Sequence, residues 1–159
     1  MIKVTLIALG KLKEKYLADA VKEYEKRLSR YCRLNIIELE PVKLNSTPSD
    51  GEIQNALEKE AQMILKRIPD GDDIIPLCVE GKGMTSEKLA ERFYENSADG
   101  RGMTFIIGSS YGLSEIIKKT GDLRLSLSEM TFPHRIFRVM LLEQIYRAFK
   151  INEGSAYHK

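Results

Sequence analysis

Residues 103–119 read MTFIIGSSYGLSEIIKK, and they indicate how the rest of the chain is built. The run MTFII consists mainly of large apolar side chains, which predicts a buried strand that ends at Gly108. Residues 113–119 have the spacing of a short helix. A buried strand, a glycine turn and a helix in succession are typical of a mostly parallel α/β sheet.

The same alternation extends in both directions from this stretch. Apolar runs predict further strands at residues 2–9, 34–39, 73–79 and 123–127. Apolar residues at helical spacing predict helices at 14–31, after a capping box of Ser49 and Glu52, at 85–96 behind Thr85, and from Pro133 to about Lys150. Between these elements, Gly81–Gly83 is expected to be a loop. The sequence thus predicts one α/β domain over residues 1–159, with helices flanking the sheet.

The composition is that of an ordinary globular protein. The chain has 159 residues, of which 43% are hydrophobic and 30% charged, and this excludes disordered and collagen-like classes. No apolar run approaches the roughly 20 residues needed to cross a bilayer, and MIKVTLIALG is followed by no signal-peptide cleavage site. Cys32 and Cys78 have no Cys or His nearby, which favours two buried thiols over a disulfide or zinc site. We therefore expect a cytoplasmic protein without a membrane partner.

Charge is distributed unevenly along the chain. Residues 1–33 carry nine Lys/Arg against four Asp/Glu, and residues 133–159 carry five against two. The middle, 34–132, carries eleven Lys/Arg against seventeen Asp/Glu. If the two ends meet in space, they form a positive face that would suit a polyanion such as nucleic acid. The alternative is that these cations decorate solvated helix faces.

Two interpretations compete for Gly108–Gly112. The letters match the G-x-S-x-G elbow of a serine hydrolase, with Ser110 as nucleophile and with Asp122 and His134 following in the order of that fold. Against this, the chain is short and has no second oxyanion loop. The other interpretation is a glycine turn that a ligand or another backbone segment approaches closely. In parallel sheets, ligands bind beyond the carboxyl ends of the strands, which is where this turn would lie.

The C-terminal third carries two further candidate sites. Residues 126–134 place small hydroxyls, Met and Phe before the last helix, where a flat heterocycle could bind; the alternative is a capped turn with Phe132 in the core. Arg135 and Arg138 share a helix face and suit phosphate contact. Tyr157 and His158 could stack on a base and accept a proton, although a chain terminus often frays. The two histidines do not suggest a metal site.

Three stretches of the chain closely resemble one family. They are GKLKEKY at 10–16, IIGSSYGL at 106–113 and TFPHRIFRVMLLEQIYRAFKINEGSAYHK at 131–159. They are similar to the bacterial RlmH family, the large-subunit rRNA pseudouridine N3-methyltransferases of the SPOUT superfamily. The resemblance runs from Ile2 to Lys159.

The resemblance implies a SPOUT methyltransferase fold whose C-terminal part threads a deep trefoil knot. It implies S-adenosylmethionine as methyl donor, a homodimer, and methylation of N3 of a pseudouridine in 23S rRNA on the assembled ribosome. Neither DNA nor a membrane is implied as a partner.

The resemblance also implies roles for particular residues. By motif matching, the cofactor site comprises Leu77, Gly108, Leu127, Ser128, Glu129, Met130, Thr131 and Phe132. Tyr157 and His158 are expected to close over the base as catalytic residues. Arg135, Arg138 and Lys159 are expected to form the RNA contact; the alternative for Arg138 and Lys159 is that they position the tail. No metal is expected.

The sequence departs from the family at Ser109, where a second glycine is usual. A serine can keep the turn if its φ stays negative, but it narrows the approach to the turn. Two rival functions remain open at this point: a serine hydrolase built on Ser110, and a non-catalytic ribosome-binding module.

Overall fold

A computed structural model describes all residues, 1–159. Five parallel strands form one sheet in the order β2-β1-β4-β3-β5. The strands are β1 (Ile2–Leu9), β2 (Cys32–Leu39), β3 (Asp73–Gly83), β4 (Met103–Ile107) and β5 (Leu125–Ser126). The helices are α1 (Lys15–Leu28), α2 (Asp50–Leu65), α3 (Ser86–Ala98), α4 (Glu115–Thr120) and α5 (His134–Asn152), followed by a short 3₁₀ helix at Ala156–His158. The predicted parallel α/β sheet flanked by helices is confirmed.

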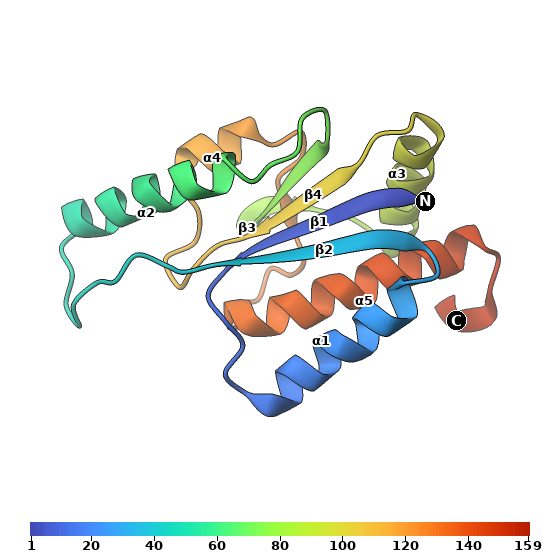
Figure 1. Cartoon of the computed structure of the whole chain (residues 1–159), viewed down its shortest axis with the longest axis horizontal. Helices are drawn as coiled ribbons and strands as arrows, with labels where there is room; N and C mark the ends of the chain where they lie inside the picture. Colours follow the sequence, from blue (N-terminus) through green and yellow to red (C-terminus); the bar gives the residue numbers. More distant parts are fainter.

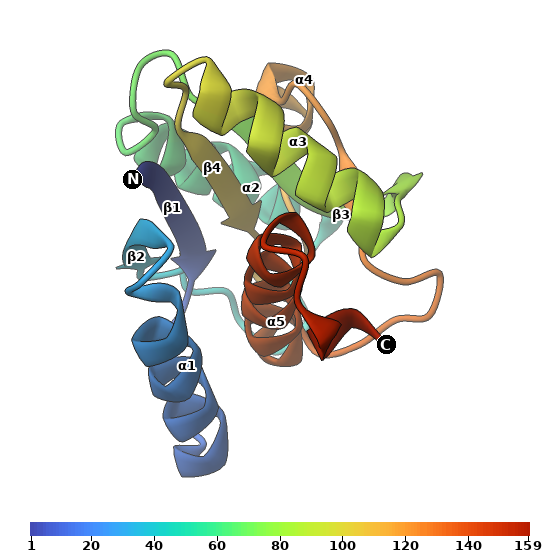
Figure 2. The same ribbon diagram turned by 90° about the vertical axis from the view of Figure 1, so that its right-hand side faces the viewer.

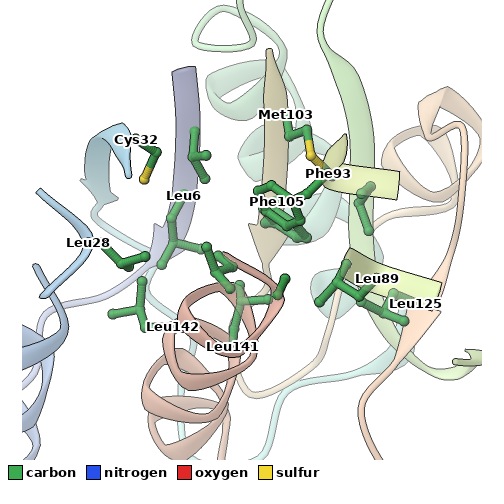
Figure 3. Packing of buried hydrophobic residues seen from close by; sticks show 14 of the residues in the cluster. Leu6, Leu28, Cys32, Leu89, Phe93, Met103, Phe105, Leu125, Leu141 and Leu142 are labelled. Carbon is green, nitrogen blue, oxygen red and sulfur yellow. The ribbon is translucent and has the colours of Figure 1, made fainter. Parts of the chain in front are cut away.

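The helices cover both faces of the sheet. Figure 1 shows α2 and α4 on one side of the strands and α1 and α5 on the other. The larger apolar cluster joins one face of the strands to α1, α3 and α5, and Figure 3 shows Leu6, Phe105 and Leu141 within it. A smaller cluster joins the other face to α2 and α4, through Ile64 and Ile117. Side chains alternate between the two faces along each strand, so β1 contributes to both clusters.

Most predicted element boundaries lie within a few residues of those observed. The Ser49 capping box and the Thr85 N-cap are both present. Pro133 precedes α5 as its N-cap residue, one position earlier than the first helical position predicted for it. The strand predicted at 123–127 is reduced to Leu125–Ser126.

The prediction of a loop at Gly81–Gly83 is wrong. These residues continue β3, because the backbone of β5 lies alongside them and supplies hydrogen-bond partners. The Lys82 N–H donates to the Arg124 carbonyl at 2.8 Å, and Gly83 is in register with Ser126. A Cβ on Gly81 would lie 2.9 Å from the Arg124 carbonyl oxygen, so the glycine permits this close approach.

The basic ends of the chain do meet, since α1 packs beside α5 (Figure 2). Each Lys and Arg of α5 pairs with a carboxylate: Arg135 with Glu14, Arg138 with Glu38, Arg147 with Glu143, and Lys150 with Glu153. In residues 1–33, by contrast, only Lys15 and Arg27 form ion pairs. The unpaired cations of the two ends therefore come mainly from residues 1–33.

Both cysteines are buried free thiols, as predicted. Burial raises the pKa of the Cys32 thiol to about 12, so it stays protonated and unreactive. None of the helices is long and apolar enough to span a membrane.

Candidate functional site

A cavity of about 870 Å³ lies at the carboxyl edge of the sheet. It is enclosed by the start of α1, the end of β3, the turn after β4, the segment after β5, and the first turn of α5. Half of its lining residues are apolar, and its size is that of a pocket for a small organic ligand. This is the edge at which parallel sheets bind ligands.

Six of the eight residues predicted to bind the cofactor line this cavity. They are Leu77, Gly108, Leu127, Ser128, Thr131 and Phe132. The other two, Glu129 and Met130, are exposed outside the lining, and Met130 is 72% exposed. The structure thus brings together segments separated by up to 55 positions, from Leu77 to Phe132.

Gly108–Gly112 forms a tight turn in which two backbone segments touch. A Cβ on Gly108 would lie 2.3 Å from the Gly112 carbonyl oxygen, closer than any real contact. Gly112 has a φ of 82° and its N–H donates to the Ser109 carbonyl at 2.9 Å. No residue other than glycine has a positive φ, so Ser109 fits the turn as expected. The interpretation as a glycine turn of close approach is confirmed.

The arrangement needed by a serine hydrolase is absent. The Asp122 carboxylate accepts the Ile74 N–H at 3.0 Å and pairs with Arg101, near the amino end of β3. His134 lines the cavity at the opposite, carboxyl edge of the sheet. Because the acid and the histidine never meet, the triad of Ser110, Asp122 and His134 is not formed and that interpretation is wrong.

The segment after β5 is shaped by its own hydroxyls. The Ser126 hydroxyl donates to the Ser128 carbonyl at 2.9 Å, and the Ser128 hydroxyl accepts the Met130 N–H at 3.0 Å. Phe132 is 36% exposed and its ring lies edge-on to Phe137, with centroids 5.8 Å apart. The alternative that placed Phe132 in the core is therefore wrong, and its ring borders the cavity instead.

Two charged side chains of the cavity, Glu80 and Lys118, were not among the predicted site residues. Glu80 and Lys118 pair at the end of β3, and the hydrogen bond from Lys118 holds the pKa of the Glu80 carboxyl below its usual value. Burial lowers the pKa of His134, and Arg135 and Arg138 lower it further, which favours a neutral imidazole. No local sequence signal links Glu80 to Lys118, since they lie 38 positions apart.

Arg135 and Arg138 have different environments. Arg135 lines the cavity and donates to Glu14, the N-cap residue of α1, at 2.6 Å. Arg138 is buried, with 3% of its side chain exposed; it pairs with Glu38 at 2.6 Å and donates to the Gly10 carbonyl at 3.0 Å. A guanidinium enclosed in this way has no free face for a phosphate. The prediction that Arg138 contacts RNA therefore does not fit its position, which indicates a structural ion pair.

Tyr157 and His158 lie outside the lining of the cavity, on a tail that folds back against α5 near the chain end marked in Figure 1. The Tyr157 hydroxyl donates to Glu143 at 2.9 Å, and His158 Nε2 lies 2.7 Å from a Glu87 carboxylate oxygen. Glu143, which accepts the Tyr157 hydroxyl, is the tenth of the 19 residues of α5, so the tail contacts the middle of the helix, about 14 Å along its axis from His134. Within one chain, the predicted catalytic residues are thus separated from the predicted cofactor residues. Lys159 is exposed beside them.

The cavity fits a nucleoside-type cofactor. Leu77 and Leu127 supply apolar surface from two adjacent strands or their extensions, and the Gly108 turn leaves backbone groups open to a ligand. No group of three or more His, Cys, Asp or Glu side chains is placed to hold a metal ion.

The family model described as "Predicted SPOUT methyltransferase" matches residues 2–158. The chain belongs to the SPOUT methyltransferase family. A relative from Bifidobacterium adolescentis, named ribosomal RNA large subunit methyltransferase H, is 50% identical over 159 residues, covering 99% of this chain and all of that protein. A relative of the same name from Clostridium kluyveri is 50% identical over 157 residues, covering 98% and 99%. The resemblance found in the sequence is thereby confirmed.

Two solved structures share the fold at low sequence identity. A methylase family protein from Neisseria gonorrhoeae aligns with a TM-score of 0.57 at 11% identity, covering 91% of this chain and 82% of its own. One from Haemophilus influenzae aligns with a TM-score of 0.51 at 11% identity, covering 96% and 67%. At this identity the likenesses show a shared fold alone.

Proposed function

We propose that this protein is an S-adenosylmethionine-dependent methyltransferase that methylates N3 of a pseudouridine in 23S rRNA on the assembled ribosome. The observation that carries the proposal is the cavity at the carboxyl edge, where the Gly108 turn and the segment after β5 meet in a chain of the SPOUT family. Two relatives that are 50% identical to this chain are named as ribosomal RNA methyltransferases, which supports rRNA as the substrate.

The residues of the cavity would bind and orient the two reactants. When bound, the cofactor supplies a methyl group already activated on a sulfonium. Leu77, Leu127 and Phe132 would hold a flat adenine ring, and the backbone of the Gly108 turn would hydrogen-bond its polar edge. Most of the rate enhancement would come from holding the methyl carbon in line with the base nitrogen.

Removal of the N3 proton needs an acceptor near that nitrogen. Tyr157 and His158 remain our candidates, with the tail of one subunit closing over the cavity of another. This arrangement agrees with their position outside the cavity lining. It makes the homodimer a requirement for activity, because one chain alone does not hold both parts of the site.

Contact with RNA would rely on cations that have no carboxylate partner. Lys159 is exposed beside the tail, and Arg135 lines the cavity although Glu14 partly neutralises it. In the segment after β1, Lys15 pairs with Asp19, whereas Lys11 and Lys13 are exposed and unpaired. These two lysines were not singled out in the sequence, and they flank the cavity wall formed by Glu14 and Tyr16. The trefoil knot and the cytoplasmic location stay predictions.

The test is transfer of labelled methyl from S-adenosylmethionine to ribosomes that lack this modification. Assembled ribosomes and separate large subunits are compared, and mass spectrometry identifies the modified nucleoside. Label on N3 of a 23S pseudouridine in assembled ribosomes is the expected result. Ribosome binding without any label, beside an active control enzyme, would instead indicate a non-catalytic binding module.

A further inference from the structure

Glu60 is a buried acid that has no basic partner. It lies on α2, and only 4% of the residue is exposed. Its two carboxylate oxygens accept hydrogen bonds from neutral groups: the Val42 N–H at 2.9 Å and the Ser109 hydroxyl at 3.2 Å. Burial raises the pKa of this carboxyl, although both hydrogen bonds oppose the shift. Burying an acid without a basic partner lowers the stability of the protein unless its hydrogen bonds compensate for the lost hydration.

The two partners of Glu60 come from different parts of the carboxyl edge. Val42 follows β2, and Ser109 follows β4, with β1 lying between those two strands in the sheet. One side chain therefore connects two loops across the carboxyl end of β1. The apolar neighbours Ala61 and Ile64 fix α2 against the sheet, so the carboxylate extends from a rigid element.

Ser109 transmits this contact to the cavity. Its carbonyl accepts the Gly112 N–H at 2.9 Å, and the preceding Gly108 lies against the Gly112 carbonyl. The bond to Glu60 is the only side-chain hydrogen bond from residues 108–112 to another element. A shift of Ser109 would consequently change how Gly108 and Gly112 touch, and with it the cavity wall.

We propose that Glu60 is a positioning residue that acts through Ser109 to hold the Gly108–Gly112 turn in the shape needed for cofactor binding. Glu60 itself does not line the cavity, so its effect on the ligand is indirect. The link to S-adenosylmethionine rests on the proposed function, whereas the effect on the turn does not. The Ser109 hydroxyl of this chain thus has a defined role where the family usually has glycine.

The first experiment measures amide hydrogen exchange of residues 108–113 without any ligand. Glu60→Met keeps the length of the side chain but removes both acceptors, and Ser109→Ala removes only the hydroxyl. Each is expected to speed exchange of the turn about fivefold, the effect of losing one net hydrogen bond. Glu60→Gln should restore wild-type exchange, because its carbonyl can accept from Val42 and its amide can donate to the Ser109 oxygen. Unchanged exchange in Glu60→Met would overturn the proposal.

The second experiment measures the dissociation constant of S-adenosylmethionine by calorimetry for the wild type, Glu60→Met, Ser109→Ala and the double variant. Each single variant should weaken binding about fivefold, and the double variant should be no weaker than either. Additive losses would show that Glu60 does not act through Ser109 and would overturn the proposal. A wild type that fails to bind the cofactor would refute the proposed function alone, and the exchange experiment would still decide the role of Glu60.

Discussion

Gly108 is the residue on which the shape of the cavity most directly depends. Its missing side chain lets the backbone of Gly112 come into contact, and the same turn forms part of the ligand wall. Its importance could be inferred from the sequence, because a glycine directly after a buried strand predicts such a turn. That Gly108 would contact the Gly112 backbone could not be inferred, because this depends on how the following four residues fold.

Gly108→Ala is expected to abolish detectable methyl transfer and to lower the free energy of unfolding by about 1–3 kcal/mol, the usual cost of overpacking. The added Cβ would lie 2.3 Å from the Gly112 carbonyl oxygen. Urea unfolding and cofactor calorimetry measure the two effects. The control for the steric contact is Gly83→Ala at the end of β3, whose Cβ meets nothing within 4 Å. Equal behaviour of the two variants would contradict this account of the turn.

Arg138 shows where sequence reasoning reaches its limit at single residues. Its spacing from Arg135 indicated a shared, solvated face, but Glu38, its partner, lies 100 positions away. Only the folded structure shows that β2 brings this carboxylate to α5. Burial then changes the expected role of the guanidinium from contact with phosphate to support of the Gly10 turn.

Arg138→Met should lower the free energy of unfolding by about 1–3 kcal/mol, because two hydrogen bonds are removed while the half-exposed Glu38 can still be hydrated. The salt dependence of ribosome binding should stay as in the wild type. Arg33→Met, at an exposed position on β2, serves as the control for stability. A weaker salt dependence of ribosome binding in Arg138→Met would contradict this conclusion and support the contact with phosphate that was predicted from the sequence.

At the scale of elements, the sequence predicted those helix caps and strands that depend on interactions within a few residues. The caps at Ser49 and Thr85 and the buried strand at 103–107 are present because hydrogen bonds and apolar runs within a few residues produce them. The extension of β3 through Gly83 was missed, since its partner strand lies some 40 positions later. Glycines in a sequence usually indicate a loop, and here they form a strand only because the backbone of β5 lies beside them.

The helix α2 offers a test of pH-dependent stability. The folded pKa of Glu60 is raised above 4.5, so between 4.5 and that folded value the native state binds more protons than the unfolded state. Stability contributed by Glu60 therefore falls as the pH rises through this window. Glu60→Gln should gain stability relative to the wild type as the pH rises from 4.5, and the gain should then level off. Urea unfolding at several pH values measures this, and the exposed Glu58→Gln should show no such trend.

The segment between β1 and α1 offers a test of RNA contact. Lys11→Gln with Lys13→Gln is expected to reduce the slope of log affinity against log salt by about 1–2, because the variant neutralises fewer phosphates and so releases fewer counterions on binding. Filter binding to ribosomes at several salt concentrations measures the slope. Lys15→Gln, which removes a lysine already paired with Asp19, should have a smaller effect. An unchanged slope in the double variant would place the RNA elsewhere.

At the scale of the whole molecule, the two predicted parts of the site do not share one cavity. The cavity adjoins His134, and the tail with Tyr157 and His158 lies beyond Asn152. The motifs in the sequence indicated both parts but not their separation. The tail packs against Glu143 and Glu87 instead of the cavity wall, and this separation is the physical reason why a second subunit enters the proposal.

Mixing two inactive variants tests whether subunits share a site. Gly108→Ala damages the cavity, and His158→Ala damages the tail. If the tail of one subunit serves the cavity of its partner, heterodimers hold one intact composite site. Random mixing should then recover about a quarter of wild-type methyl transfer, since half of the dimers are mixed and each has one working site of two. Gly108→Ala alone, taken through the same mixing procedure, gives the background. If the tail serves its own chain, both subunits of a mixed dimer stay inactive.

The placement of α5 also has a consequence for the synthesis of the protein. This helix supplies Leu141, Leu142, Ile145 and Ala148 to the larger apolar cluster, where they cover the middle of the sheet. The ribosome makes residues 134–152 after all five strands. Until they emerge, α1 and α3 cover this face only in part, and the nascent chain exposes an apolar surface that chaperones recognise. An enzyme proposed to modify finished ribosomes would thus complete its own core only in the last moments of translation.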